Sequence, residues 1–316
     1  MQEFFSWFYL QKTFSHDWPQ WRGVNRDGKV TGFNVPTKWQ EDNEILRSLD
    51  ANSGKEIWRK DEFTNGLPMF FTGMSPIIVD GLCIAHLGGA ENGKIIAFDI
   101  PTGNIKWKWD GDGPSYSSPI LMTMDGKKQV IIQTDKNLIG LTITDGKLQW
   151  QISTPPMQRF YNSSSPIADG QNLIFTGHGT GIWAIKILKQ GDGFITSEVW
   201  HNSDLNPSYN TPVLKESSLY GLAQTGKLFC INAQNGQTAW ADTLMHKNFG
   251  AILDAGLVIL ALPSSANLVV YKPDKSAYAE VARFKVSDTP VYAHPLLVGN
   301  RIYVKDNETL VMWTVQ

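Results

Sequence analysis

The sequence predicts an all-β protein: a β-propeller of four-stranded antiparallel blades, with seven blades of which the first is truncated. Two observations carry this prediction. A Ser-Pro or Thr-Pro step followed by apolar residues recurs about every 45 residues, and a tryptophan recurs with the same period. Helical periodicity is absent from every long window. Units of about 40 to 50 residues with four short strands are typical of propeller blades, whose sheets pack face to face around a ring.

The proline step marks the innermost strand of each blade. It occurs at Ser75-Pro76, Ser118-Pro119, Ser165-Pro166 and Thr211-Pro212, with His294-Pro295 as a variant. The unit missing between the last two is expected to begin near Ile252. Each step leads to a polar turn and a second apolar run, which together predict a hairpin.

A third apolar run in each unit ends in a turn and leads to the recurring aromatic residue. The series is Trp58, Trp107, Trp150, Trp200 and Trp240, and Phe284 continues it. The run before Trp107, for example, ends in Thr102-Gly103, a typical turn dipeptide. The strand that carries the tryptophan is therefore expected to be the fourth and outermost strand of its blade.

The two ends of the repeat are incomplete. The unit that ends at Trp58 has a single strand candidate before it, at residues 45–49, and the last unit has three candidates, at 295–297, 302–304 and 310–315. We expect a strand near Thr37 to Trp39 to complete the last blade and close the ring. Six blades is the alternative, in which residues 45–60 complete the C-terminal sheet. The predicted organisation is an N-terminal arm or degenerate signal segment at 1–16 and a single propeller domain at 17–316.

Composition excludes several functional classes. The chain has 28 Lys and Arg against 30 Asp and Glu, so its net charge of -2 offers no footprint for nucleic acid. The sequence contains no apolar stretch of about 18 residues, so no transmembrane span is predicted. Cys83 and Cys230 lie far apart and are expected to be two buried thiols, and the six histidines show no spacing typical of a metal site. The oligomeric state stays open.

Three segments resemble the quinoprotein repeat, which is named after pyrroloquinoline quinone (PQQ). Residues 49–58, 98–107 and 231–240 follow its pattern of Asp, two spacers, Thr-Gly, three spacers and Trp, with Ser or Asn at some positions. The resemblance implies that the five tryptophans dock adjacent blades and that the turn glycine takes a positive φ.

The segment Asp17-Trp18-Pro19-Gln20-Trp21-Arg22-Gly23 resembles the N-terminal signature of exported bacterial propellers of this quinoprotein-like family. The resemblance implies a periplasmic or cell-envelope location. The alternative is a cytoplasmic one.

Aromatic residues precede the innermost strands and define the candidate ligand site. They are Phe71, Tyr116, Tyr161, Tyr209, Phe249 and Tyr292, with Arg159, Asn162, Asn210 and His294 as polar neighbours. Because all innermost strands begin at the same mouth of the funnel, we predict an aromatic-lined pocket that stacks on a flat ligand such as a sugar ring or a quinone. The alternative is that these rings fill the narrow centre and interlock the blades.

The function that these features favour is a non-catalytic binding or assembly platform for a protein partner or a small sugar-like ligand. Such a protein would resemble the envelope propeller that scaffolds outer-membrane protein assembly. The first alternative is a PQQ- and calcium-dependent alcohol or sugar dehydrogenase, although no catalytic residue and no vicinal cysteine pair match that branch. The second alternative is a carbohydrate-binding propeller. No cofactor or metal is predicted outside the first alternative.

Overall fold

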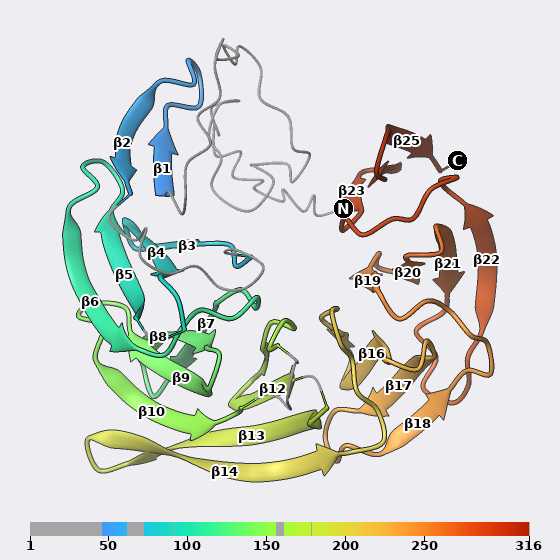
Figure 1. The fold of residues 1–316 in the computed structure, drawn as a ribbon. Coiled ribbons are helices and arrows are strands. Elements are labelled where there is room, and N and C mark those ends of the chain that lie inside the picture. Colours follow the sequence, from blue (N-terminus) through green and yellow to red (C-terminus); the bar gives the residue numbers. More distant parts are fainter. Residues whose placement is uncertain (1–45, 62–72, 91, 156–160, 178, 316) are drawn as a thin grey trace, which may run out of the picture.

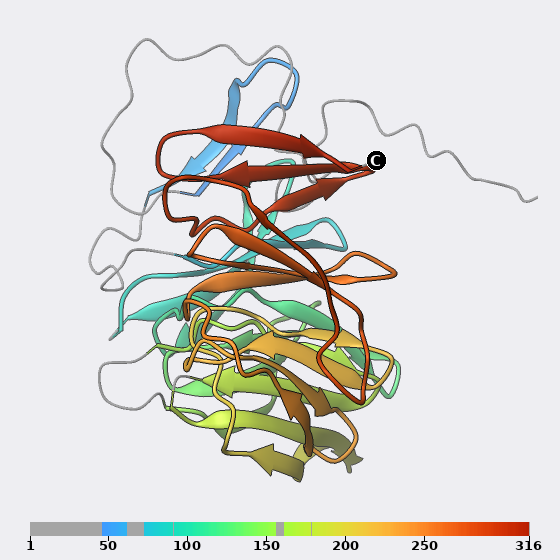
Figure 2. The ribbon, with the colours of Figure 1, turned by 90° about the vertical axis from the view of Figure 1, so that its right-hand side faces the viewer.

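The computed structural model describes residues 46–61, 73–90, 92–155, 161–177 and 179–315, and their regular structure is entirely β. The strands form seven separate antiparallel sheets that follow one another around a central axis (Figure 1). Turned by 90°, Figure 2 shows these sheets layered one beside the next along the ring. No described residue belongs to a helix that could cross a membrane. The sheets confirm the predicted seven-bladed all-β propeller.

The truncated first blade and the closing blade are the first and last sheets along the chain. Blade 1 contains β1 (Leu46–Leu49) and β2 (Glu56–Lys60), and blade 7 contains β23 (Leu296–Val298), β24 (Arg301–Lys305) and β25 (Leu310–Thr314). Among the described residues the two sheets do not pair, so β1 and β2 do not extend the C-terminal sheet and the six-bladed alternative is not observed. The arm at 1–16, the signature at 17–23 and the closing strand near Thr37 lie outside the described residues.

Five complete blades lie between them, each with four strands in sequential order. Blade 2 is β3 (Ile77–Val79), β4 (Leu82–Leu87), β5 (Gly93–Asp99) and β6 (Ile105–Gly111), and blade 3 is β7 (Ile120–Met124), β8 (Lys127–Gln133), β9 (Asn137–Thr142) and β10 (Leu148–Ser153). Blade 4 is β11 (Ile167–Asp169), β12 (Asn172–Gly177), β13 (Gly181–Gln190) and β14 (Gly193–Asn202). Blade 5 is β15 (Val213–Lys215), β16 (Ser218–Leu222), β17 (Leu228–Asn232) and β18 (Thr238–Ala241), and blade 6 is β19 (Gly250–Asp254), β20 (Ile259–Pro263), β21 (Asn267–Tyr271) and β22 (Glu280–Lys285).

The hydrophobic core lies between the blades. One cluster joins Ile84 and Ile95 of blade 2 to Val130 and Leu141 of blade 3, all of them fully buried. Since each middle strand is covered by a neighbouring sheet on both faces, β4, β16 and β20 are buried along nearly their whole length without alternation. Burial of apolar area between sheets therefore holds the ring together.

The serine or threonine before each inner proline joins neighbouring blades. The Ser75 N–H donates to Ser118 Oγ at 3.1 Å, Ser118 N–H to Ser165 Oγ at 2.9 Å, and Ser165 N–H to Thr211 Oγ1 at 2.9 Å. Each hydroxyl thus satisfies a backbone donor of the preceding blade near the crowded axis. This arrangement explains why a hydroxyl residue recurs in the proline step.

The recurring tryptophans dock one blade on the next. The indole Nε1 atoms of Trp58, Trp107, Trp200 and Trp240 donate to backbone oxygens of the following blade, at Ile100 (2.7 Å), Ile143 (2.7 Å), Ala233 (2.8 Å) and Asp274 (2.8 Å). Three of these rings lie against a glycine with φ between +67° and +73°, where a Cβ would meet the indole at 2.7 Å (Gly103), 2.3 Å (Gly146) and 2.6 Å (Gly236). Both the positive φ and the close approach require glycine.

Two members of the aromatic series depart from this arrangement. Trp150 is buried, but its Nε1 donates at 2.9 Å to Gln129 Oε1 of its own blade. In blade 4 the turn between the third and fourth strands does not contact this tryptophan. The strands β13 and β14 are ten residues long, and nothing lies within 4 Å of the Cβ position of Gly191 in the turn that joins them. Phe284 is 53% exposed, since blade 7 presents no docking turn among the described residues. Trp150 still packs against Leu173 and Ile185 of blade 4, so only its hydrogen bond stays within its own blade. Phe284 continues the period without docking on a neighbouring blade.

Asp135, in the turn between β8 and β9, gives the fold a testable pH dependence. Desolvation raises the pKa of Asp135 to about 6, and its Oδ1 is buried without a hydrogen-bond partner. A carboxyl with a raised pKa in the folded state contributes stability below its unfolded pKa of about 3.9, and that contribution is lost as the pH rises to about 6.

The variant Asp135→Asn is therefore expected to be about 1 kcal/mol more stable to unfolding than the wild type at pH 7.5, after allowance for solvent screening. The difference between the two proteins should shrink at pH 4.5, where the wild-type carboxyl is largely protonated when folded. Urea denaturation of both proteins at the two pH values measures it. Equal stability at pH 7.5 would contradict the assigned burial of this carboxylate.

Candidate functional site

The predicted site residues lie in the linkers that enter the innermost strands. The hydroxyl bonds between successive proline steps place these linkers next to one another at one face of the propeller. Of the predicted set, Tyr116, Tyr161, Asn162, Tyr209, Asn210, Phe249, Tyr292 and His294 are described. Phe71 and Arg159 lie outside the described residues.

The aromatic rings gather in two groups. Tyr116 and Tyr161, which lead into blades 3 and 4, meet edge to face with their centroids 5.3 Å apart. In the second group Tyr209 stacks on Phe249 at 4.5 Å with an interplanar angle of 7°, and Phe249 meets Tyr292 edge to face at 5.8 Å. We call Tyr209, Phe249 and Tyr292 the aromatic row. It crosses blades 5, 6 and 7.

The aromatic row is open to solvent. Tyr209, Phe249 and Tyr292 are 40%, 38% and 65% exposed, and Met245 in the linker before Phe249 is 75% exposed. Stacked rings that keep this much exposed surface do not simply fill the centre of the ring. A connected group of exposed apolar side chains is typical of a binding surface. The sequence pattern did not identify Met245, because it does not repeat from blade to blade.

The predicted polar neighbours have structural partners. Asn162 Nδ2 donates to the backbone oxygens of Thr134 (3.0 Å) and Thr154 (2.9 Å), and Asn210 Nδ2 donates to Leu222 O at 2.9 Å. Both side chains are buried. His294 is exposed, and its Nδ1 lies 3.0 Å from Pro295 O. The two asparagines therefore position linkers, and the rings supply the accessible surface.

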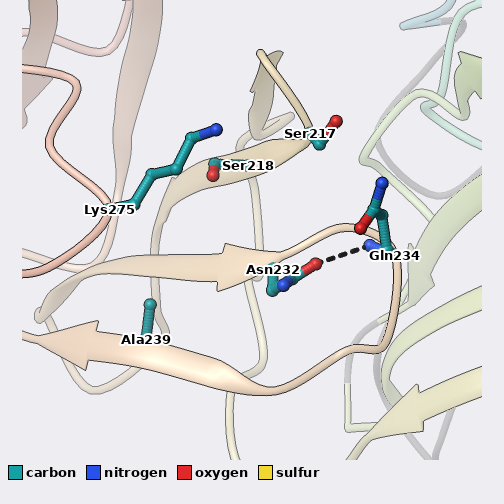
Figure 3. Close-up of a pocket in the computed structure, with 6 residues that line it drawn as sticks. All are labelled: Ser217, Ser218, Asn232, Gln234, Ala239 and Lys275. Carbon is teal, nitrogen blue, oxygen red and sulfur yellow. Dashed lines mark hydrogen bonds between the residues drawn. The ribbon is translucent and has the colours of Figure 1, made fainter.

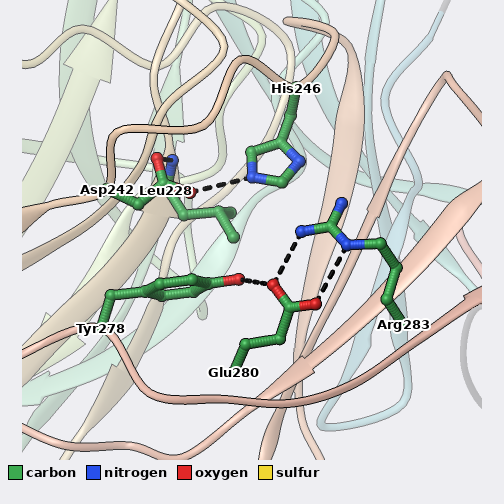
Figure 4. A network of polar contacts seen from close by, with 6 residues as sticks. All are labelled: Leu228, Asp242, His246, Tyr278, Glu280 and Arg283. Carbon is green, nitrogen blue, oxygen red and sulfur yellow. Dashed lines mark hydrogen bonds and ion pairs between the residues drawn. The ribbon is translucent and has the colours of Figure 1, made fainter.

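A buried histidine and carboxylate fix the linker that carries Met245 and Phe249. His246 Nε2 lies 2.9 Å from Asp242 Oδ2, and Asp242 Oδ1 accepts the Leu228 N–H at 3.0 Å (Figure 4). Both side chains are almost fully buried, and the His246 N–H donates to Gly226 O at 2.7 Å. Sequence analysis missed this pair, although the spacing of four residues between Asp242 and His246 was a usable signal.

A second polar group lies beside this pair. Glu280 accepts hydrogen bonds from the Tyr278 hydroxyl at 2.6 Å and from Arg283 Nη2 at 2.7 Å (Figure 4). The Arg283 guanidinium is the main cause that lowers the pKa of Glu280. The Glu280 group lies on blade 6 and the His246 pair on blade 5. Polar contacts therefore hold the start of the linker between these two blades in place.

The two cysteines bear on the alternative of a quinone-dependent alcohol dehydrogenase. Cys83 and Cys230 are buried in hydrophobic clusters of different blade interfaces, which confirms two separate thiols. Desolvation raises the pKa of Cys83 to about 11 and also raises that of Cys230. Within the described part of the chain no three His, Cys, Asp or Glu side chains are grouped to hold a metal ion. The placement of the two thiols therefore does not match the vicinal cysteine pair of that branch.

Comparison with protein families gives a match over most of the repeat. The model of the family described as outer membrane protein assembly factor BamB matches residues 41–280, which is more than half of the chain. BamB of Yersinia pestis is 25% identical over 272 residues, covering 83% of this chain and 64% of the relative. BamB of Nitrosomonas eutropha is 26% identical over 285 residues, covering 86% of this chain and 64% of the relative. The chain thus spans just under two thirds of the length of these relatives.

Quinone-dependent dehydrogenases match a short segment of the sequence, but their structures superpose on most of the chain. Quinohemoprotein alcohol dehydrogenase of Comamonas testosteroni is 36% identical over 67 residues, which is 20% of this chain and 10% of that protein. Its crystal structure superposes with a TM-score of 0.60 at 16% identity, covering 82% of this chain and 59% of that one. At this identity the likeness shows the shared propeller fold.

Proposed function

Because the chain belongs to the family of the outer membrane protein assembly factor BamB, we propose that it is a non-catalytic binding platform for outer membrane protein assembly in the bacterial cell envelope. The observation that carries this proposal is the family match over residues 41–280, which extends from just before blade 1 to the start of β22. The signature at 17–23, which resembles that of exported propellers, supports a periplasmic location.

The aromatic row is the surface on which we place the protein partner. Large rings bind a partner's apolar side chains at a low cost in conformational entropy, and aromatic residues are common energetic anchors of interfaces. Tyr209, Phe249 and Tyr292 come from three different blades, so a partner segment that lies along the row contacts all three linkers. The His246 and Asp242 pair keeps the middle linker in place before the partner binds.

A photo-crosslinking residue at Met245 tests this placement. Met245 is 75% exposed beside the row, so an envelope extract is expected to give a crosslink to a protein of the outer membrane assembly machinery, identified by mass spectrometry. Leu257 is the matched control, because it is 91% exposed in the turn between β19 and β20, at the opposite end of the inner strand. The same crosslink from Leu257, or none from Met245, would contradict the proposed surface.

A further inference from the structure

A small cavity lies between blades 5 and 6, at the end of β15 opposite the aromatic row. Its volume is about 250 Å³, and its lining residues, drawn in Figure 3, are Ser217, Ser218, Asn232, Gln234, Ala239 and Lys275. At about 30 Å³ per water molecule, this space holds on the order of eight waters. It is smaller than the pockets of roughly 300–1,000 Å³ that take drug-sized ligands, so it suits a ligand of a few heavy atoms.

The turn that forms one wall carries a strained serine. Glu216 and Ser217 have φ values of +47° and +63°, and the same two-residue turn elsewhere is Asp80-Gly81 (+49° and +79°) and Asp125-Gly126 (+48° and +74°). Ser217 thus occupies a position that blades 2 and 3 give to glycine. A side chain in this conformation costs about 1–2 kcal/mol. Such strain is often found at functional sites, and here it places a hydroxyl in the cavity wall.

The docking turn that forms another wall has lost its carboxylate. The equivalent turns of blades 1, 2 and 3 carry Asp50, Asp99 and Asp145, whereas the turn of blade 5 carries Asn232 and Asn235 at these positions. Asn232 Oδ1 accepts the Gln234 N–H at 2.9 Å, which fixes the asparagine amide at the cavity (Figure 3). The wall therefore offers neutral hydrogen-bonding groups and no negative charge.

Lys275, an exposed residue in the loop before β22 of blade 6, is the one charged side chain among the lining residues. In the described part of the chain its ammonium group makes no ion pair, whereas Lys128 and Lys215 on the same face pair with Asp80 and Asp254 at 2.8 and 2.9 Å. The neighbouring Asp274 carboxylate is held by the N–H and hydroxyl of Ser276 at 2.7 and 2.6 Å. The Lys275 ammonium is therefore exposed to solvent and available to an anion that enters the cavity.

We propose that this cavity binds the carboxylate group of a small polar ligand. The Lys275 ammonium pairs with the carboxylate, and the Ser217 hydroxyl and the Gln234 amide hydrogen-bond its oxygens or adjacent hydroxyl groups. Lysine acts as a point charge, whereas arginine binds a carboxylate through two parallel hydrogen bonds. A single lysine therefore suits a ligand with one negative charge. The carboxylate can belong to a free metabolite or to the C-terminus of a peptide, because the cavity is open on one side.

Calorimetric titration at low ionic strength tests the proposal with two acids and their neutral counterparts. The probes are D-gluconate against D-glucose, and acetyl-trialanine with a free C-terminus against its amide. At least one acid is expected to bind with a Kd in the millimolar range, while both neutral probes give no binding heat. Gluconate binding alone assigns a free metabolite, and peptide binding alone assigns a chain terminus.

Three variants locate the site. Lys275→Gln is expected to weaken acid binding at least tenfold, whereas the matched control Lys272→Gln, an exposed lysine outside the lining, changes it less than twofold. Ser217→Gly restores the glycine of the equivalent turns, so it should weaken binding about threefold while the melting temperature stays equal or rises. The proposal is overturned if no acid binds at about 50 mM, if the neutral probes bind equally, or if Lys275→Gln behaves like Lys272→Gln.

Discussion

Replacement of Trp107 by alanine is expected to lower the free energy of unfolding by about 3–5 kcal/mol, the range for a large aromatic side chain removed from a core. The indole is buried between blades 2 and 3, in a cluster with Ile95 and Leu141. Its Nε1 donates to Ile143 O, and its ring covers Gly146. The alanine variant loses the apolar contacts on both blades and leaves the Ile143 carbonyl without its donor. Urea denaturation followed by tryptophan fluorescence and circular dichroism measures the loss.

The variant Trp107→Phe separates packing from hydrogen bonding. Phenylalanine keeps most of the buried ring but has no N–H, so it is expected to cost about 1–3 kcal/mol, the penalty of a buried carbonyl without a partner plus a small cavity. The order of stability is therefore wild type, phenylalanine variant, alanine variant. An alanine variant within about 1 kcal/mol of the wild type would show that this tryptophan does not hold the blades together.

Gly146→Ala is expected to be the second most damaging change. Gly146 has a φ of +67°, and a Cβ there would lie 2.3 Å from the Trp107 ring. The substitution adds the left-handed backbone penalty of about 1–2 kcal/mol to an overpacking cost of about 1–3 kcal/mol, because the ring is buried and cannot move aside. The expected loss of unfolding free energy is about 3 kcal/mol.

Gly126 supplies the matched control. It has a similar φ of +74°, but nothing lies within 4 Å of its Cβ position, so Gly126→Ala carries the backbone penalty alone and should cost about 1 kcal/mol. The difference between the two variants measures the contact between the turn and the tryptophan of the preceding blade. Equal losses of unfolding free energy in the two variants would mean that the contact between the docking turn and Trp107 does not contribute to stability.

Much of the fold was predictable because its determinants repeat. The proline steps locate the inner strands, and four of the five predicted tryptophans donate to the next blade. The hydrogen bond of Trp150 was not predictable from its own segment. Blade 4 has a long hairpin in place of the docking turn, so the indole donates to Gln129 of its own blade. Local sequence identifies a docking residue, but the neighbouring blade provides the acceptor.

The candidate site was predictable in part for the same reason. Tyr209, Phe249 and Tyr292 occupy equivalent positions before inner strands, so the sequence places them at one face. Their grouping apart from Tyr116 and Tyr161, and their exposure, depend on packing between linkers of different length and sequence. Asn162 and Asn210 look like ligand contacts in the sequence, yet the backbone groups that they bind are set by the tertiary structure.

The most direct test of the proposed assembly function is the abundance of outer membrane proteins in the organism that encodes this chain. Deletion of the gene is expected to lower that abundance, measured by quantitative mass spectrometry of isolated outer membranes, and the wild-type gene should restore it. A variant with Tyr209, Phe249 and Tyr292 all replaced by serine should accumulate normally and fail to restore it, whereas Leu257→Ser on the opposite face should succeed. An unchanged outer membrane after deletion, or full restoration by the triple variant, would contradict an assembly platform that acts through the aromatic row.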